Sequence, residues 1–108
     1  MRRYEEALTV WRKVAALRPG HPQAQASIGL CCARLRRWAE AIEAYERAVR
    51  QRPDDVMNRL RLGLLYGQVG QWDRGIETLR EALALDPDNE LLQRALRDLE
   101  QGRRRSRP

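Results

Sequence analysis

The sequence predicts an all-α fold, a right-handed solenoid of antiparallel helix hairpins with about six helices. Three segments carry apolar residues at offsets of 0, 3, 4, 7, 10 and 11, the spacing of one helix face. They repeat every 34 residues and begin at Tyr4, Trp38 and Trp72. A proline follows each segment at the same distance, as Pro19, Pro53 and Pro87. Repeats of this length are typical of helical solenoids, in which each unit packs against its neighbour.

A second helix pattern lies between these segments with the same period. It contains Ile28-Gly29 in one copy and Leu62-Gly63 in the next. Each unit therefore has an inner and an outer helix, and the prolines end the outer helices because the residue before a proline avoids the helical region. The predicted helices span residues 3–17, 22–35, 38–51, 56–69, 72–85 and 89–101.

Residues at the helix ends support these boundaries. Asp55 and Asn89 are suited to N-cap positions, and Pro22 is suited to a first helical position. Gly70 is suited to the left-handed residue that ends a helix. Gly102 is expected to end the last helix.

The repeat phase also predicts the organisation of the chain. Residues 1–21 hold the outer helix of a truncated first unit, 22–55 and 56–89 are two complete units, 90–102 form a C-terminal capping helix, and 103–108 form a disordered basic tail. The first helix has no inner mate, so its face with Tyr4, Leu8 and Trp11 should be partly uncovered. We interpret the chain as a segment of a longer array, with pairing of this face in a homodimer as the alternative.

The repeated pattern resembles that of the tetratricopeptide repeat family, W-x2-L-G-x2-Y…A-x3-F…P. The inner helices read Gln25-x2-Ile28-Gly29-x2-Cys32 and Arg59-x2-Leu62-Gly63-x2-Tyr66. The outer helices read Ala7-x3-Trp11…Pro19, Ala41-x3-Tyr45…Pro53 and Gly75-x3-Leu79…Pro87. Gln25 and Arg59 stand where the family often has Trp, and Gly75 stands where it has Ala. A mid-helix glycine reduces stability by about 1 kcal/mol, so these departures leave the fold unchanged.

The resemblance implies that a partner binds in a concave groove lined by the inner helices. By analogy, the groove-facing residues are Gln23, Ala26, Leu30, Arg34, Met57, Leu60, Arg61, Leu64, Gln68, Leu91, Arg94 and Asp98. The apolar residues Leu30, Met57, Leu60 and Leu64 are expected to be exposed, unless packing between helices covers some of them. The arginines Arg34, Arg61 and Arg94 suit an acidic residue or a terminal carboxylate. The expected partner is a protein or peptide, extended or helical, with apolar anchors and some negative charge.

One known specificity of the family does not fit these residues. Some members clamp the acidic C-terminus of heat-shock chaperones with Lys, Asn and Arg side chains on successive inner helices. Only Arg61 falls on such a position in this sequence. Binding of a chaperone tail through that clamp is therefore not expected.

The inventory of reactive side chains argues against an enzyme, a metal site or a cofactor. His21 is the single histidine and lies in a turn, and Cys31 and Cys32 are adjacent on a helix. This set has no metal-ligand spacing and supplies no catalytic triad or phosphate loop. The cysteines are expected to be buried and reduced. Any catalysis would lie in a fused domain, with this segment as the non-catalytic interaction part of a larger enzyme.

The charge of +6 is concentrated at the C-terminal end. Four arginines among residues 103–108 leave a net charge of +2 for residues 1–102. A weak nucleic-acid contact through this tail is an alternative function, but the nearly neutral remainder disfavours it. No apolar run is long enough to span a membrane, and no signal peptide is evident. We therefore expect a cytoplasmic protein, and the excess of arginine over lysine suggests a bacterial source.

Overall fold

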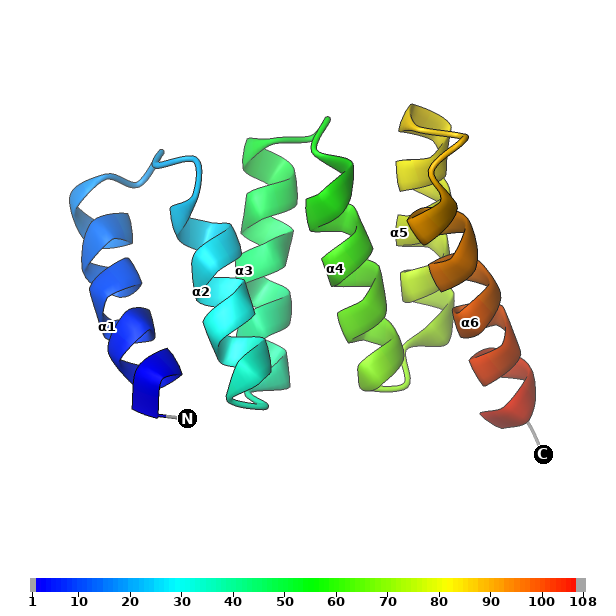
Figure 1. Cartoon of the computed structure of the whole chain (residues 1–108), viewed down its shortest axis with the longest axis horizontal. Coiled ribbons are helices and arrows are strands. Elements are labelled where there is room, and N and C mark those ends of the chain that lie inside the picture. Colours follow the sequence, from blue (N-terminus) through cyan, green and yellow to red (C-terminus); the bar gives the residue numbers. More distant parts are fainter. Residues whose placement is uncertain (1, 107–108) are drawn as a thin grey trace. The chain divides into compact units, whose positions relative to one another are not determined.

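A computed structural model of the chain describes residues 2–106, which form six helices and no strand (Figure 1). The predictions that concern Met1, Arg107 and Pro108 lie outside the described residues. The prediction of an all-α fold is confirmed. The helices are α1 (Arg2–Leu17), α2 (Ala24–Arg34), α3 (Trp38–Gln51), α4 (Val56–Gln68), α5 (Trp72–Leu85) and α6 (Glu90–Ser106).

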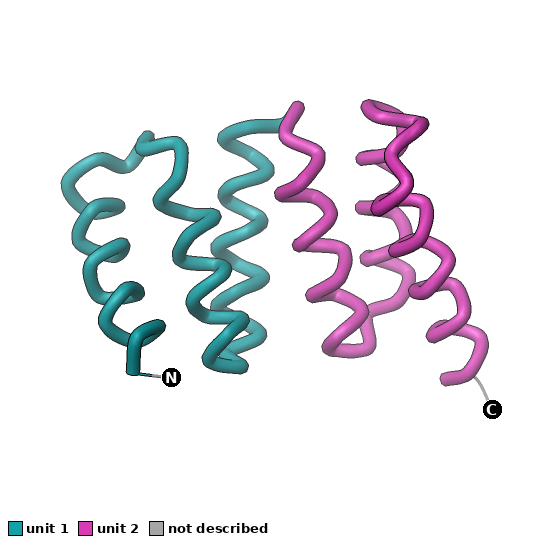
Figure 2. Tube along the Cα trace, viewed as in Figure 1, with its two compact units in different colours: residues 1–53 teal, residues 54–108 magenta. Residues whose placement is uncertain are grey.

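The chain divides into two compact units, which we call unit 1 and unit 2 (Figure 2). Unit 1 spans Met1–Pro53 and contains α1, α2 and α3. Unit 2 spans Asp54–Pro108 and contains α4, α5 and α6. Within unit 1, α2 contacts both α1 and α3, and within unit 2 the helices α4, α5 and α6 all contact one another. Each unit is therefore a three-helix body with its own core.

Small residues set the spacing of the helix pairs. A Cβ atom on Gly29 would lie 2.6 Å from two ring atoms of Tyr45, which is buried on α3. A Cβ atom on Gly63 would lie 2.8 Å from Cγ of Leu79 on α5. Each inner helix thus presents bare backbone to a bulky side chain of the outer helix.

Helix boundaries follow most of the predicted end signals, and the exceptions are Pro22 and Gly102. Asp55 Oδ1 accepts hydrogen bonds from the amides of Met57 and Asn58, and Asn89 Oδ1 accepts one from the amide of Leu92. The prediction that Pro22 opens a helix is wrong, because α2 begins at Ala24. The imidazole Nδ1 of His21 accepts the amide proton of Gln23 at 3.1 Å, which holds this stretch as a turn.

The first helix is less uncovered than the repeat phase predicts. Leu8 is buried, because α1 packs against α2. Tyr4 and Trp11 are half-buried, and the ring of Trp11 meets the imidazole of His21 edge-on, with centroids 5.8 Å apart. The exposed large apolar side chains of this helix are Val10 and Leu17, which are 59% and 84% exposed. The expectation of exposure is therefore wrong for Leu8.

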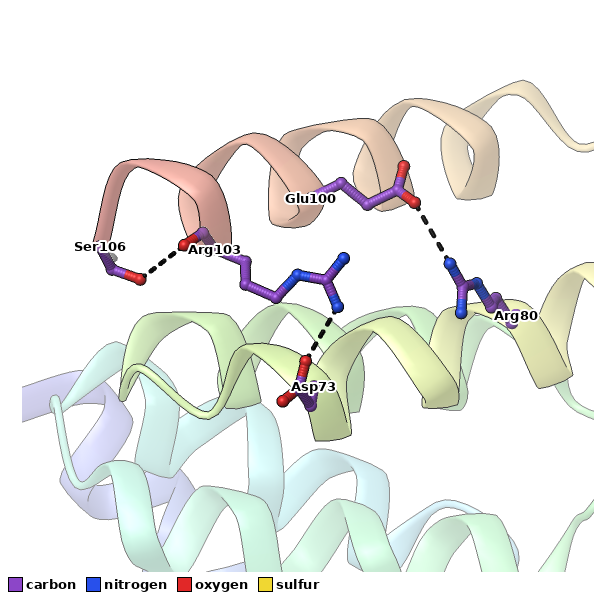
Figure 3. A network of polar contacts seen from close by, with 5 residues as sticks. All are labelled: Asp73, Arg80, Glu100, Arg103 and Ser106. Atoms are coloured by element: carbon purple, nitrogen blue, oxygen red, sulfur yellow. Dashed lines mark hydrogen bonds and ion pairs between the residues drawn. The ribbon is translucent and has the colours of Figure 1, made fainter. Parts of the chain in front are cut away.

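The basic C-terminal segment is helical as far as it is described, which corrects the expected end at Gly102 and the expected disorder of residues 103–106. The helix continues through Gly102. A Cβ atom there would lie 2.5 Å from the indole of Trp72, so the glycine lets this ring pack against α6. Arg103 donates to Asp73 at 2.9 Å, and Arg80 donates to Glu100 at 3.3 Å (Figure 3). These exposed ion pairs each contribute about 0–1 kcal/mol and orient α6 against α5.

The turn after α2 contains a strained residue. Gly70 has a φ of +80°, as predicted for the residue that ends a helix, and Arg36 holds the equivalent position with a φ of +59°. A side chain in this region raises the energy of the folded state by about 1–2 kcal/mol.

We expect Arg36→Gly to raise the free energy of unfolding by about 0.5–1 kcal/mol after the added flexibility of the unfolded chain is counted. Urea denaturation measures this change. The control is Arg52→Gly, at a φ of −133°, which should give no gain. An equal gain in both variants would contradict this explanation.

Candidate functional site

The predicted partner-binding residues of unit 1 lie on or next to α2. Leu30 is 37% exposed and Arg34 is exposed, whereas Ala26 is half-buried. Gln23 is exposed but precedes the first turn of the helix, and it donates its amide to His21. The exposed surface of α2 is therefore formed by Leu30 and Arg34 at its C-terminal half.

The predicted residues of α4 form a continuous exposed stripe. Met57, Arg61, Leu64 and Gln68 are spaced by four, three and four residues, and all are exposed. Such spacing places them on one face of the helix. Met57 is 38% exposed and Leu64 is 45% exposed. Because α4 is otherwise largely buried, this stripe is the surface through which it can meet a partner.

Leu60 does not belong to the exposed stripe, and its predicted exposure is wrong. It is only 7% exposed and lies in the core of unit 2 with Ile76, Leu79, Leu92 and Leu99. The physical reason is that α4 packs against α6 as well as α5, so the face of α4 that carries Leu60 is covered. Leu60 therefore supports the fold and cannot serve as a surface anchor.

Helix α6 repeats the pattern of α4 within the same unit. Leu91 and Asp98 stand 34 residues after Met57 and Leu64, and both are exposed, as is Arg94. Leu91 is 57% exposed. An open depression of about 420 Å³ lies against this part of α6, lined by Glu90, Leu91, Gln93, Arg94 and Arg97. We call the exposed residues Met57, Arg61, Leu64, Gln68, Leu91, Arg94 and Asp98 the α4–α6 surface.

Some exposed apolar residues were not found by the repeat pattern. Val69 is exposed at the end of α4, and Leu85 at the end of α5. Each is the last apolar residue before a turn, where helical periodicity stops and gives no indication of the side that a side chain faces. The only sequence signal at these positions is an apolar residue next to Gly70 or just before Pro87.

The two thiols are poorly suited to nucleophilic chemistry. Cys31 and Cys32 are both free and buried. Burial raises the pKa of both thiols, and the carboxylate of Glu40 raises that of Cys32 further, against lowering by Arg12 and Arg37. The reactive thiolate is therefore scarce at neutral pH. Within residues 2–106 no group of three or more His, Cys, Asp or Glu side chains is placed to hold a metal ion.

None of the described helices combines the length and apolar character that crossing a membrane requires.

Comparison with known proteins agrees with the repeat pattern. Two family models, both described as Tetratricopeptide repeat, match residues 1–56 and residues 33–99. The comparison with curated proteins gave no match.

Solved structures with the same fold include a domain bound to a peptide. The first tetratricopeptide repeat of Spaghetti (RPAP3), bound to the HSP90 peptide SRMEEVD, is similar with a TM-score of 0.85 and 21% identity, over 92% of this chain and 79% of that chain. The first tetratricopeptide repeat domain of human RPAP3 is similar with a TM-score of 0.86 and 20% identity, over 96% of this chain and 84% of that chain.

A MamA RS-1 double mutant is similar with a TM-score of 0.85 and 30% identity, over 95% of this chain. The present chain spans 57% of that MamA chain. The structural matches show an all-α solenoid fold, and the two family models together cover nearly all of the sequence. The chain belongs to the tetratricopeptide repeat family.

Proposed function

We propose that the chain is a protein-interaction scaffold that holds an extended or helical peptide segment of a partner. Domains of its family are in general non-catalytic modules that bind other proteins. A peptide complex of a domain with the same fold supports the proposal, since the first domain of Spaghetti (RPAP3) was solved with an HSP90 peptide. The single observation that carries it is the exposed apolar part of the α4–α6 surface.

The apolar members of this surface are well placed as anchor sites. Met57 and Leu64 lie two turns apart on α4, and Leu91 lies on α6, which packs directly against α4. Apolar side chains of a peptide that covered them would be removed from water, which contributes about 25 cal/mol per Å² of buried apolar area. Leu30 has the equivalent register in unit 1, 34 residues before Leu64.

Charge on the same surface indicates the polar character of the peptide. Arg61 and Arg94 flank the apolar residues, and Asp98 is the one acidic member of the surface. Guanidinium groups form strong, often bidentate hydrogen bonds with carboxylates. We therefore propose a peptide that combines apolar anchors with an acidic residue or a C-terminal carboxylate. The proposal does not include the set of Lys, Asn and Arg side chains with which some family members bind the acidic C-terminus of a chaperone, because only Arg61 falls on one of those positions.

A charged substitution in the centre of the α4–α6 surface tests the proposal. Peptides selected from a displayed random library against the full chain should be rich in apolar and acidic residues. Leu64→Arg should weaken binding of a selected peptide at least tenfold, which is about 1.4 kcal/mol, because a charge replaces the apolar contact. Isothermal titration calorimetry measures this affinity.

The matched control is Leu85→Arg, which makes the same change at an exposed leucine on α5 outside the surface. This variant should bind the selected peptide as the unsubstituted chain does, and both variants should keep the helical circular dichroism of the parent. Equal affinity of the two variants, or a selection that enriches no peptide, would contradict the proposed function.

A further inference from the structure

Unit 1 contains a cavity at a position where unit 2 has an aromatic ring. Cys32 and Tyr66 are 34 residues apart and occupy the same register on α2 and α4, and both are buried. The tyrosine ring in unit 2 lies under the guanidinium group of Arg74, 5.3 Å from its carbon. In unit 1 a half-open cavity of about 160 Å³ lies between α1, α2 and α3, and Cys32 lies beneath it without exposed surface. A cavity of about 150 Å³ is large enough to hold benzene in another protein.

The cavity has an apolar floor and a charged rim without net charge. Ile28, Cys32 and Ala44 form the floor, and all three are buried. Exposed side chains form the rim, with Arg12 and Arg47 opposed by Glu40 and Glu43. Arg12 and Glu40 form an ion pair of 2.6 Å across the helices α1 and α3. Because two cations and two anions balance at the rim, this cavity favours a neutral group over a charged one.

Gln25 adds a hydrogen-bonding atom to the cavity wall. It lines the cavity, and its Oε1 is buried without a hydrogen-bond partner among residues 2–106. A buried acceptor that lacks a partner costs about 1–3 kcal/mol of folding free energy. A bound group that carried an N–H or O–H could donate to this oxygen once the Gln25 amide turns toward the cavity, and this bond would recover part of that energy.

We propose that this cavity is a binding site for a neutral aromatic group that carries a hydrogen-bond donor, of the phenol or indole class. The ring lies above Cys32, at the register that Tyr66 holds in unit 2, against Ile28 and Ala44. Its donor reaches Oε1 of Gln25. The arginines of the rim can lie over the ring face, as Arg74 does over Tyr66. The site is separate from the α4–α6 surface, because every residue that lines it belongs to unit 1.

Titration of the full ¹⁵N-labelled and methyl-labelled chain with phenol and with indole tests this proposal. We expect saturable chemical-shift changes centred on Gln25, Cys32 and Ala44, with dissociation constants in the millimolar range, and intermolecular nuclear Overhauser effects to the methyl groups of Ile28 and Ala44. Toluene lacks the donor and should bind no more tightly than phenol, although it leaves water more readily. Non-saturable shifts, shifts centred elsewhere, or much tighter binding of toluene would overturn the proposal.

N-acetyl-tryptophanamide distinguishes two sources of the bound ring, an aromatic side chain of a partner protein and a free small molecule. If this compound binds as indole does, the cavity accepts an aromatic side chain of a partner protein. If only free indole and phenol bind, the cavity accepts small aromatic molecules. Both results support the shared chemistry, and binding of none of the three overturns it.

Filling the cavity from within gives a second test. Cys32→Tyr introduces the ring that unit 2 carries, so it should abolish the shifts caused by indole and raise the melting temperature. Cys31→Ala changes the neighbouring buried thiol, which does not line the cavity, and should leave indole binding unchanged. Binding that survives in a folded Cys32→Tyr variant would overturn the assignment. Should this variant not fold, the Overhauser contacts in the parent chain decide.

Discussion

Leu99→Ala is expected to lower the free energy of unfolding of unit 2 by about 2–5 kcal/mol, toward the upper end of that range. Leu99 is buried on α6 and projects onto two glycines, Gly67 of α4 and Gly75 of α5. Truncation of a buried leucine leaves a cavity, and the loss of stability grows with the volume that cannot collapse. Because the glycines have no side chains that could move into the space, relaxation is limited here. Urea denaturation followed by circular dichroism measures the change.

A double-mutant cycle with Gly67→Ala tests the geometry behind this result. A Cβ atom on Gly67 would overlap Cδ2 of Leu99, so Gly67→Ala alone should destabilise the chain. In the Leu99→Ala background the overlap is absent, and the same substitution should be neutral or stabilising. The two changes should therefore depart from additivity by about 0.5–3 kcal/mol, the range for residues in contact. Additive effects would show that Leu99 does not sit over Gly67.

Gly75→Ala is expected to destabilise the chain by about 2 kcal/mol, although alanine is the better helix former. The propensity gain is about 1 kcal/mol. Against it, the new Cβ would lie 2.8 Å from the carbonyl oxygen of Gly63 and 2.8 Å from Cδ1 of Leu99. A backbone oxygen cannot rotate away as a side chain can, so the helices α4 and α5 must separate, and overpacking of this kind costs up to about 3 kcal/mol.

The change at Gly75 is measured as a lower urea midpoint and a lower melting temperature, with a loss of about 4–8 °C per kcal/mol for a domain of this size. Gly20→Ala is the control, since a Cβ atom there meets no atom within 4 Å. It should be neutral or slightly stabilising, because alanine restricts the unfolded chain. A stabilised Gly75→Ala variant would show that helix propensity outweighs the close approach of the two helices.

These two predictions also show where sequence reasoning was sufficient. The 34-residue recurrence of Ile28-Gly29 and Leu62-Gly63 identified the inner helices, on whose glycines Tyr45 and Leu79 pack. Sequence reasoning identified Asp55 and Gly70 in their local roles, since N-caps and left-handed residues depend on a few neighbouring atoms. It also suggested that Gly75 was merely a weak helix residue. The tertiary contact with Gly63 and Leu99 that explains this glycine is not visible in a local pattern.

Errors in the sequence analysis arose where packing between different helices decides the outcome. Leu60 has the spacing of an exposed residue on α4, but contact with α6 covers it. Leu8 is covered by α2 in the same way. The C-terminal arginines have a composition typical of a solvated tail, yet Arg103 pairs with Asp73 and Gly102 receives the indole of Trp72. Composition describes the solvation of a segment and does not register a contact thirty residues away.

The candidate surface was largely identified from the sequence, with Leu60 as the exception among its apolar residues. Met57, Leu64 and Leu91 are exposed as expected, because a residue that faces away from both neighbouring helices can be located from register alone. The cavity beside Cys32 was not identified. The replacement of an aromatic ring by a thiol between copies is visible in the sequence, but whether neighbouring side chains fill the space depends on Arg12, Gln25 and Glu40, which lie on three different helices.

The central claim, that the α4–α6 surface binds the partner, is tested most directly by mapping a selected peptide on the full chain with nuclear magnetic resonance. The claim predicts that the largest amide and methyl shift changes fall on Met57, Leu64 and Leu91, with smaller changes at Arg61 and Arg94. Peptide-induced changes that instead centre on the exposed faces of α3 and α5, and leave those five residues unmoved, would contradict it.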